Sequence, residues 1–229
     1  MKIAVIADVH SNLEAFMAVL DAIDEESADL ILNAGDLVGY GANPNEVIQL
    51  NREMKIRTIM GNHDFSSLEL EDIESFNQTA AEALYWTHNE LKDENKAYLR
   101  SLPRTMKIEN IFAVHGSPED ELWEYVEPDA ARKKLVHFFN VIKDEKINIL
   151  AMGHTHLPFI RKLGKKLVVN PGSVGQPRDR NPKASYCVLD SKTLKAEIRR
   201  IEYLIDKAAD KIRKAKLPDL LASRLFLGK

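Results

Sequence analysis

Residues 3–10 of the chain read IAVIADVH: five apolar residues, then an aspartate and, two positions later, a histidine. A short apolar run that ends in polar residues is typical of a buried strand. In α/β proteins, ligands bind beyond the carboxyl ends of the strands. On extended backbone, Asp8 and His10 would point to the same side and could hold one ion. This stretch therefore predicts an α/β sheet with a site at its edge.

Five further apolar runs end in residues of the same kind. They are 30–33 before Asp36, 56–60 before residues 61–64, 111–114 before His115, 147–152 before residues 153–156, and 167–169 before residues 170–173. Five of the seven histidines fall at these strand ends, whereas His88 and His137 fall in expected helices. Imidazole nitrogen with carboxylate oxygen suits Zn, Fe, Ni or Mn rather than Ca. The pattern predicts a metal-dependent active site.

A charge count indicates what such a site would bind. Two divalent ions bring four positive charges, and Asp8, Asp36 and a bridging hydroxide remove three, which leaves about +1. The imidazoles and the amide of Asn62 are neutral and leave this sum unchanged. A mildly positive centre favours an anionic phosphoryl group over a neutral peptide. The ions would also lower the pKa of the bridging water to about 7.

The totals are those of an ordinary soluble globular protein: 229 residues, 45% hydrophobic and 29% charged. The net charge of −3 argues against nonspecific binding to nucleic acid or an anionic membrane. Cys187 is the only cysteine, so an internal disulfide is excluded; it lies in an apolar run and is expected to be a packed core thiol. We find no secretory signal and no membrane-spanning run, and expect a cytoplasmic protein.

Strand and helix alternate in the first third of the chain. Ser11 opens a capping-box pattern with Glu14, and Pro44 suits the first position of a second helix. This alternation predicts a parallel sheet with right-handed crossovers. After residue 147 the chain reads as strands 147–152, 158–163, 166–170, 184–190 and 194–200, with hairpin turns that predict antiparallel or mixed pairing.

Residues 65–105 interrupt the alternation, because they read as helices 66–70, 79–91 and 94–102 without a strand. An insertion between two strands that deliver site residues would lie over the site as a small helical cap. Helix 129–144 and an amphipathic tail from residue 203 complete the chain. We expect one domain, residues 1–229, with the cap at about 65–105.

Five motifs together resemble the ordered signature of the calcineurin-like metallophosphoesterases. They are Asp8-x-His10, Gly35-Asp36, Gly61-Asn62-His63-Asp64, His115, and Gly153-His154-x-His156. Residues 35–41, 76–77 with 80–81, and 170–179 resemble a prokaryotic subgroup often labelled phosphodiesterase or protein phosphatase. The resemblance implies an α/β fold in which two packed mixed β-sheets are flanked by helices.

The resemblance also implies two divalent metal ions, with Mn favoured among Mn, Fe, Zn, Ni and Mg, that share the bridging carboxylate of Asp36. The remaining ligands would be Asp8, His10 and His156 for one ion, and Asn62, His115 and His154 for the other. His63 resembles the family's catalytic histidine, which stabilises the transition state or protonates the leaving oxygen. Asp64 could orient its ring.

Four residues are candidate substrate contacts, each with a plainer alternative. Arg178 could bind phosphate through its planar guanidinium, and Ser173 could line the metal site, or both could belong to a plain loop. Tyr40 and Asn77 are substrate partners by resemblance, or else a packing aromatic and a helix cap. An insertion at 118–128 carries two further aromatics, Trp123 and Tyr125, that form either an apolar wall for a base or aromatic leaving group, or core packing.

The sequence thus predicts a dinuclear metal-dependent phosphoesterase that hydrolyses phosphodiesters or phosphomonoesters through a metal-bridging hydroxide. One alternative is a phosphoprotein phosphatase or a nucleotidase; a nuclease is disfavoured because no basic groove is expected. Another is a catalytically silent binding scaffold, which the presence of His63 and of every ligand disfavours. The expected partner is a phosphorylated small molecule or a phosphoprotein, with no membrane. The sequence leaves the oligomeric state open.

Overall fold

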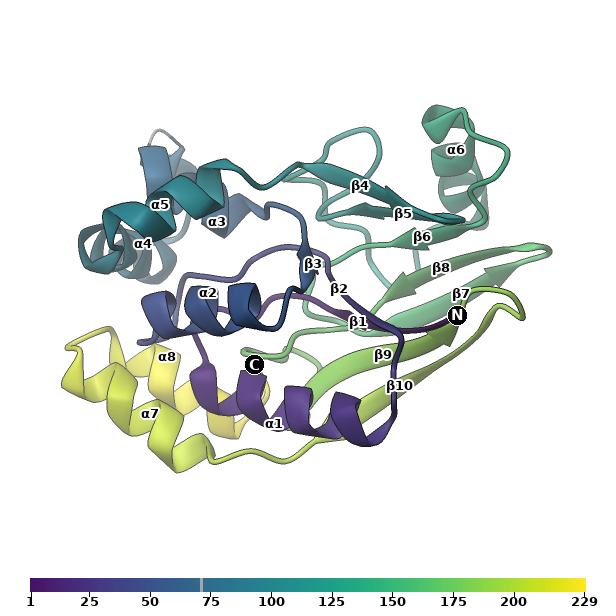
Figure 1. Cartoon of the computed structure of the whole chain (residues 1–229). Coiled ribbons are helices and arrows are strands. Elements are labelled where there is room, and N and C mark those ends of the chain that lie inside the picture. The colour runs from purple at the N-terminus through teal and green to yellow at the C-terminus, as the bar shows by residue number, and fades with distance from the viewer. Residues whose placement is uncertain (71) are drawn as a thin grey trace.

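Two five-stranded mixed sheets, packed face to face, form the centre of the computed structural model, which describes residues 1–70 and 72–229 (Figure 1). The first sheet contains, in spatial order, β10 (Lys195–Ile201), β9 (Ala184–Asp190), β1 (Lys2–Ile6), β2 (Leu30–Asn33) and β3 (Arg57–Thr58). The second contains β4 (Thr105–Ile108), β5 (Ile111–Val114), β6 (Ile149–Ala151), β8 (Lys166–Asn170) and β7 (Phe159–Leu163).

Each sheet has a parallel part and an antiparallel part. Strands β1, β2 and β3 are parallel, as are β5, β6 and β8. Strands β9, β10, β4 and β7 pair antiparallel with their neighbours. The expected fold, two packed mixed sheets flanked by helices, is therefore confirmed.

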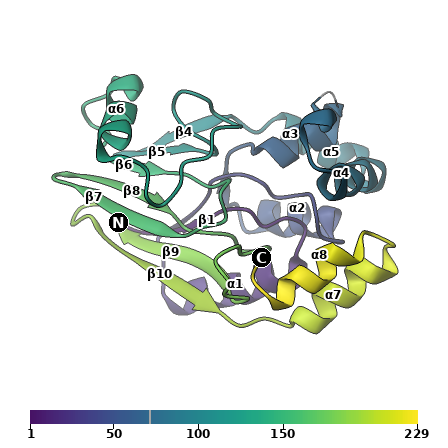
Figure 2. The ribbon, with the colours of Figure 1, turned by 180° about the vertical axis from the view of Figure 1, so that it is seen from behind.

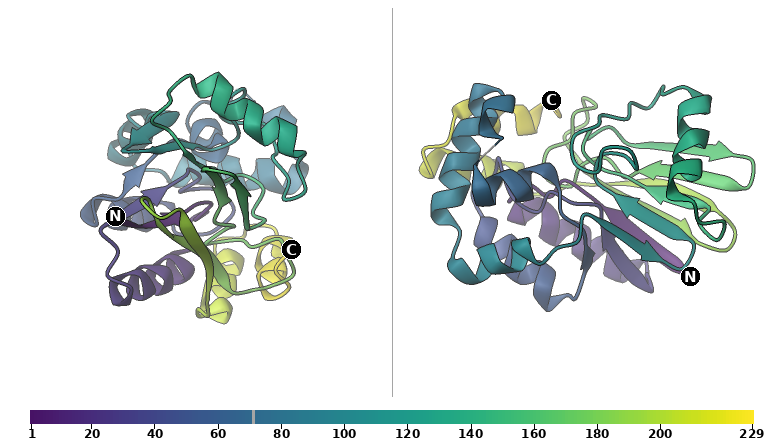
Figure 3. Two further views of the ribbon diagram at one scale, coloured as in Figure 1. Left: turned by 90° about the vertical axis from the view of Figure 1, so that its right-hand side faces the viewer. Right: turned by 90° about the horizontal axis from the view of Figure 1, so that it is seen from above.

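Alternation along the strands builds three apolar layers. Ile3 and Val5 of β1 face the second sheet, where they pack in one cluster with Ile149 of β6 and Leu167 of β8. Ile6 faces the other way, towards a helical layer formed by α1 (Leu13–Glu25) and α2 (Pro44–Glu53). The third layer lies between the second sheet and α6 (Arg132–Ile142). In the left view of Figure 3, the purple α1 and the green α6 lie on opposite outer sides of the sheets.

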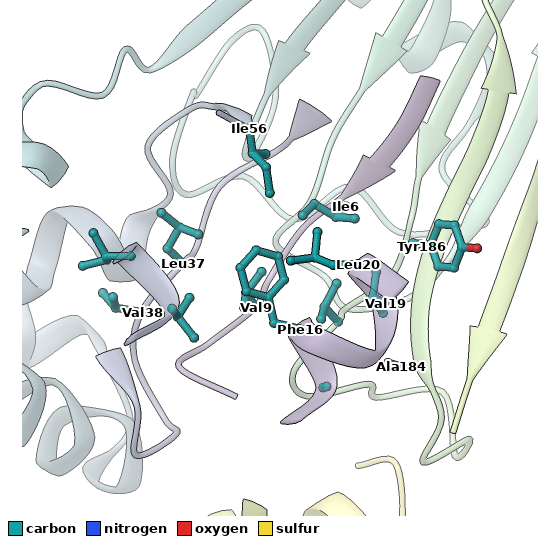
Figure 4. Packing of buried hydrophobic residues seen from close by; sticks show 14 of the residues in the cluster. Ile6, Val9, Phe16, Val19, Leu20, Leu37, Val38, Ile56, Ala184 and Tyr186 are labelled. Carbon is teal, nitrogen blue, oxygen red and sulfur yellow. The ribbon is translucent and has the colours of Figure 1, made fainter. Parts of the chain in front are cut away.

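Helix α1 shows how one apolar face fixes this packing. Phe16, Val19 and Leu20 recur at helical spacing and are buried against Ile6 of β1 (Figure 4). The cap of this helix differs from the expected capping box, because the side chain of Asn12 accepts the backbone N–H of Ala15.

Between β3 and β4, the described residues form four helices: α3 (Asn62–Glu69), η1 (Ile73–Ser75), α4 (Gln78–Glu90) and α5 (Asp93–Arg100). Helix α3 begins four residues earlier than expected, because Gly61 and Asp64 form its amino-terminal cap. Strand β4 was not expected. Residue 71, inside the predicted insertion 65–105, lies outside the described residues. The cap and the single domain stay predictions.

The chain ends in α7 (Ile205–Lys214), α8 (Asp219–Ser223) and η2 (Arg224–Phe226). Figure 2 shows α7 and α8 beneath α4, and their side chains share one apolar cluster with Tyr40. Among the described residues, no helix has the length and apolar character needed to cross a membrane.

Candidate metal centre

The carboxyl ends of the parallel strands in both sheets meet at one edge, and the predicted ligands lie there together. All seven are at most 4% exposed: Asp8, His10, Asp36, Asn62, His115, His154 and His156. Their atoms form two overlapping groups, and Asp36 lies between the groups. Its Oδ2 is 3.7 Å from His10 Nε2 and 3.3 Å from His115 Nε2.

The first group contains Asp8, His10 and His156. The two Nε2 atoms of His10 and His156 are 3.0 Å apart, and Asp8 Oδ1 is 3.9 Å and 3.6 Å from them. His10 Nδ1–H donates to the carbonyl of Val38 (3.0 Å), and His156 Nδ1–H donates to the carbonyl of Gln176 (2.6 Å). These acceptors fix the tautomers, so both Nε2 lone pairs face each other.

Two nitrogen lone pairs at that separation need a positive charge between them. Burial lowers the pKa of both His10 and His156 well below the usual value, so a proton does not supply it. Asp8 Oδ2 is buried and has no hydrogen-bond partner within the described part of the chain. A cation that binds both nitrogens and this carboxylate would satisfy all three groups, and the residues therefore fit a metal ion.

The second group is built around Asn62. Its Oδ1 is 3.1 Å from His115 Nε2 and 3.1 Å from His154 Nδ1. His115 Nδ1–H donates to the carbonyl of Ala34 (2.8 Å), whereas His154 donates from Nε2 to the carbonyl of Trp123 (3.2 Å). His154 thus presents Nδ1 to the centre and His115 presents Nε2. The second group therefore also offers both nitrogen and oxygen atoms as metal ligands.

The electrostatics of the cluster show a demand for positive charge. Burial raises the pKa of Asp8 to about 8. For Asp36, burial acts in the same direction but is outweighed by His115, which holds its pKa well below the usual range. Burial opposes protonation of His115, yet the Asp36 carboxylate raises the pKa of that imidazole to about 9. A divalent cation would replace the positive charge that these protons supply.

Five ligands have a left-handed backbone, which non-glycine residues seldom adopt. Their φ angles are 56° for Asp8, 48° for His10, 58° for Asp36, 70° for His154 and 61° for His156. Such residues cost about 1–3 kcal/mol each and cluster at functional sites. The expectation that Asp8 and His10 share one side of extended backbone is therefore wrong: β1 ends at Ile6, and the chain turns both residues inward.

His63 lies in the first turn of α3 and is buried beside the first group. Its backbone N–H donates to Asp36 Oδ1 (2.8 Å). Its ring centroid is 4.8 Å from that of His10, 4.4 Å from that of Tyr40 and 5.0 Å from that of Phe76. Burial lowers the pKa of His63 to about 4, so the ring is neutral at physiological pH.

Asp64 does not contact the ring of His63, so the predicted orienting hydrogen bond is wrong. Its carboxylate accepts the backbone N–H groups of Asp36 (2.9 Å), Val38 (3.1 Å) and Gly61 (3.0 Å). Three amide donors exhaust most of its acceptor capacity, and they join the loop after β2 to the start of α3. Asp64 positions Asp36 and α3 rather than the imidazole.

Two predicted substrate contacts lie together beside the first group. Arg178 Nη2 donates to Tyr40 Oη and to Gln176 Oε1, both at 3.2 Å. Tyr40 packs edge-on against the ring of His10, with centroids 4.6 Å apart. Within the described residues, no carboxylate lies within 4 Å of the Arg178 guanidinium, and its Nε has no partner. Arg178 thus keeps an unmatched positive charge next to the centre.

The other two predicted contacts have different positions. Ser173 is fully buried; its hydroxyl donates to the carbonyl of Asp8 and accepts the N–H of Gln176, both at 2.7 Å. Its predicted contact with substrate is therefore corrected to a role in fixing the Asp8 loop. Asn77 is exposed and caps α4 by accepting the N–H of Ala80 (3.1 Å), which is the plainer of its two interpretations.

Sequence reasoning missed the groups that orient the histidines. These are mostly backbone carbonyls, which leave no residue signature. It also missed Gln176, which binds His156 through its carbonyl and Arg178 through its side chain, and Phe76 as a neighbour of His63. The polar loop 170–179 was the available signal for Gln176.

Comparison with known proteins extends these observations. A family model described as the calcineurin-like phosphoesterase superfamily domain matches residues 1–194. An uncharacterized protein of Methanocaldococcus jannaschii is 41% identical, over 99% of this chain and 98% of its own length. A phosphodiesterase of Escherichia coli K12 is 25% identical, over 85% and 90% of the two chains. A metallophosphoesterase structure from Sphaerobacter thermophilus has a TM-score of 0.85 at 32% identity and covers 100% of both chains.

Proposed function

The chain belongs to the calcineurin-like phosphoesterase superfamily and is a metal-dependent phosphoesterase, and we propose that it hydrolyses phosphodiesters or phosphomonoesters at a dinuclear centre. The observation that carries this proposal is the pair of ligand groups that share Asp36, each with two imidazole nitrogens turned inward. When bound, two such cations activate a water molecule and offset the charge on the phosphoryl oxygens.

The protein groups around the centre have separate roles in this proposal. Arg178 binds the non-bridging phosphoryl oxygens, since its guanidinium has only neutral partners, and Tyr40 Oη holds it in place. His63, as a neutral imidazole, donates a hydrogen bond that stabilises the negative charge on the leaving oxygen; this oxygen leaves as the alkoxide and takes up a proton from solvent. Asp64 and Ser173 position the loops of Asp36 and Asp8.

The ligand chemistry favours a transition metal. Four imidazoles, two carboxylates and one amide oxygen accept Mn, Fe, Zn or Ni, and Mg less readily. We propose Mn as the working metal. Phosphorylated small molecules and phosphoproteins are both candidate substrates, and the nucleotidase and phosphoprotein phosphatase alternatives use the same centre. A silent scaffold is disfavoured because all seven ligands and His63 converge.

The test measures metal content and turnover together. We expect two metal ions per chain in manganese-loaded protein, by plasma mass spectrometry. Hydrolysis of bis(p-nitrophenyl) phosphate and of p-nitrophenyl phosphate should fall at least about 100-fold in Asp36→Asn, which removes the carboxylate shared by both ligand groups, and in His63→Ala, which removes the hydrogen bond to the leaving oxygen.

Two matched variants control for nonspecific effects of these changes. His137→Ala removes a histidine on an exposed face of α6, and Asp210→Asn removes an exposed aspartate of α7. Both should retain wild-type turnover. If Asp36→Asn and His63→Ala also retain it, the proposed mechanism is wrong.

A further inference from the structure

Three aromatic side chains border the metal centre, and we call them the aromatic wall: Phe76, Trp123 and Tyr125. The ring of Tyr125 lies 3.9 Å from that of His154, tilted by 40°. Phe76 is in edge contact with both His63 (5.0 Å) and Trp123 (5.6 Å). The wall thus contacts both the proposed catalytic histidine and a ligand histidine.

Phe76 packs against the apolar cluster that contains Tyr40, but Tyr125 is open to solvent, which a packing role does not explain. Tyr125 is 53% exposed although its ring lies against a buried histidine. Trp123 and Phe76 are half-buried. Large aromatic rings that border a polar centre and keep an exposed face are typical of ligand sites.

The segment that carries Trp123 and Tyr125 has no helix or strand, yet it is firmly held. Leu122 and Val126 are each 2% exposed and anchor it in the core, on either side of Tyr125. Trp123 N–H donates to Asp120 Oδ1 (3.1 Å). The carboxylate of Glu124 binds Ser117 and, at 2.6 Å, Lys134. The wall is therefore formed before any ligand binds, which lowers the entropic cost of binding.

The first ligand group has a cationic neighbour. Arg178 lies beside His156 and Tyr40, in the first ligand group, whereas the wall lies beside His154, in the second. A substrate whose phosphoryl group lies at the centre, with oxygens towards Arg178, would direct its organic part to the aromatic side. A planar group there would stack on Tyr125 or Trp123.

We propose that the substrate is a nucleotide-type ester, in which a nucleobase stacks on the aromatic wall while its phosphate occupies the centre. This rests on the proposed function and adds the class of substrate. The sugar separates the base from the phosphorus, and the ring of His154 likewise lies between the centre and Tyr125. The wall offers exposed ring faces, so it binds bases through stacking and does not select among them.

The experiment compares esters in which the phosphate is attached to the same primary 5′ oxygen of ribose and that differ only in the presence of a base. Adenosine 5′-monophosphate is paired with ribose 5-phosphate, and the methyl ester of each forms the diester pair. Base stacking on one aromatic side chain predicts that kcat/KM for the nucleotide exceeds that for the sugar phosphate by about 5- to 150-fold in manganese-loaded protein.

The variants locate this preference on the wall. The kcat/KM ratio should fall towards one in the alanine variant of the ring on which the base stacks, Tyr125→Ala or Trp123→Ala, and should be retained in Tyr125→Phe, which keeps the ring. The ratio is the readout, because Tyr125 touches a ligand and its loss can change turnover of both esters equally. Tyr85→Ala removes a tyrosine of α4 that is similarly exposed (49%) and should leave the ratio and the turnover unchanged.

A binding measurement separates this proposal from the proposed function. Calorimetry on metal-loaded His63→Ala should show the same preference in Kd without turnover. If wild-type protein hydrolyses none of the esters, the proposed function is wrong. The ratio of the two Kd values then tests base stacking on the aromatic wall by itself. Two results would contradict base stacking on the aromatic wall. One is an equal Kd for the nucleotide and the sugar phosphate, and the other is a preference that is retained in both alanine variants.

Discussion

At the scale of single residues, strain and chemistry coincide at the centre. Asp8 and Asp36 have positive φ angles of 56° and 58°, yet both are held through their backbone N–H groups: Asp8 N–H donates to Gly35 O (3.0 Å), and Asp36 N–H donates to the side-chain Oδ2 of Asp64 (2.9 Å). The motifs predicted which side chains come together at the centre. They did not predict these conformations, which depend on contacts between loops that lie far apart in sequence.

Gly61 is required by the close approach of Asp36. A Cβ atom at Gly61 would lie 2.0 Å from Asp36 Oδ1, so Gly61→Ala must displace the shared carboxylate. We expect at least about a 100-fold loss of turnover and a decrease of about 1–3 kcal/mol in the free energy of unfolding. Plasma mass spectrometry should show loss of bound metal, and urea denaturation measures the stability.

Gly164→Ala is the matched control for Gly61→Ala. Gly164 lies in the β7–β8 hairpin, where an added Cβ meets nothing within 4 Å, although its φ of +70° disfavours alanine. This variant should lose about 1 kcal/mol of stability and no metal. Full metal content in Gly61→Ala would show that Asp36 can move without consequence.

Cys187 should be unreactive in the folded protein. It is fully buried, and burial raises the pKa of its thiol to about 12, so almost no thiolate exists at pH 8. Ellman's reagent at pH 8 should label less than about 1% of the chain while it is folded and one thiol per chain in guanidinium chloride. Rapid labelling of folded protein would contradict the burial.

At the scale of elements, an ion pair between the half-buried Lys211 and the buried Glu14 docks α7 onto α1. Lys211 Nζ lies 2.7 Å from Glu14 Oε1 and also donates to Asn43 Oδ1 (2.8 Å). Lys211→Met leaves the buried carboxylate with only Lys207, at 3.5 Å. We expect a loss of about 1–3 kcal/mol, because an unmatched buried charge carries its desolvation cost. The urea midpoint measures it.

The lysine control for this change lies on the same helix. Lys214→Met removes an exposed charge of α7, and it should shift the urea midpoint little. Glu14→Met combined with Lys211→Met should recover part of the lost stability, because both charges are then removed. An unchanged midpoint in Lys211→Met alone would show that the pair contributes nothing.

Strands with a strong local sequence signal were predicted closely, whereas the edge strand β4 was not predicted. Strands 166–170 and 184–190 match β8 and β9 residue for residue, since apolar runs and hairpin turns define both ends. Strand β4 (Thr105–Ile108) escaped prediction because it is an edge strand of half-exposed residues. The strand is stabilised by its antiparallel pairing with β5, although its own sequence has no strong strand signal.

At the scale of the whole molecule, bound metal should stabilise the packing of the two sheets against each other. The ligands come from loops after strands of both sheets, so unfolding must release the ions. At a hundredfold excess over Kd, one ion adds about 2.7 kcal/mol, which corresponds to a rise of about 5–10 °C in Tm. Scanning calorimetry with and without manganese measures the shift.

Two variants sharpen this thermal test. His63→Ala keeps all seven ligands and should show the full rise in Tm, whereas Asp36→Asn should lose most of it. A rise that is equal in both variants would mean that the ions bind elsewhere.

How the two sheets face each other was not derivable from the residues alone. The apolar pattern predicted parallel strands followed by antiparallel ones, which suits several α/β arrangements. The sandwich came from the family resemblance, since the contacts of Ile3 and Val5 with Ile149 and Leu167 join segments more than 140 residues apart in sequence. Side-chain periodicity predicts which face of a strand is apolar, but it does not predict which other element packs against that face.

The helices after β10 contain none of the seven proposed ligands, yet they pack against Tyr40, which holds Arg178, the proposed phosphate-binding residue. Ala209 of α7 and Leu221 of α8 pack in one cluster with Tyr40, and Arg180 N–H donates to Gly228 O (2.8 Å) two residues beyond Arg178. Substitutions in these helices can therefore shift the position of Arg178 while every metal ligand is inherited unchanged. In descendants of this chain, the choice of ester can evolve in the tail independently of the hydrolytic chemistry.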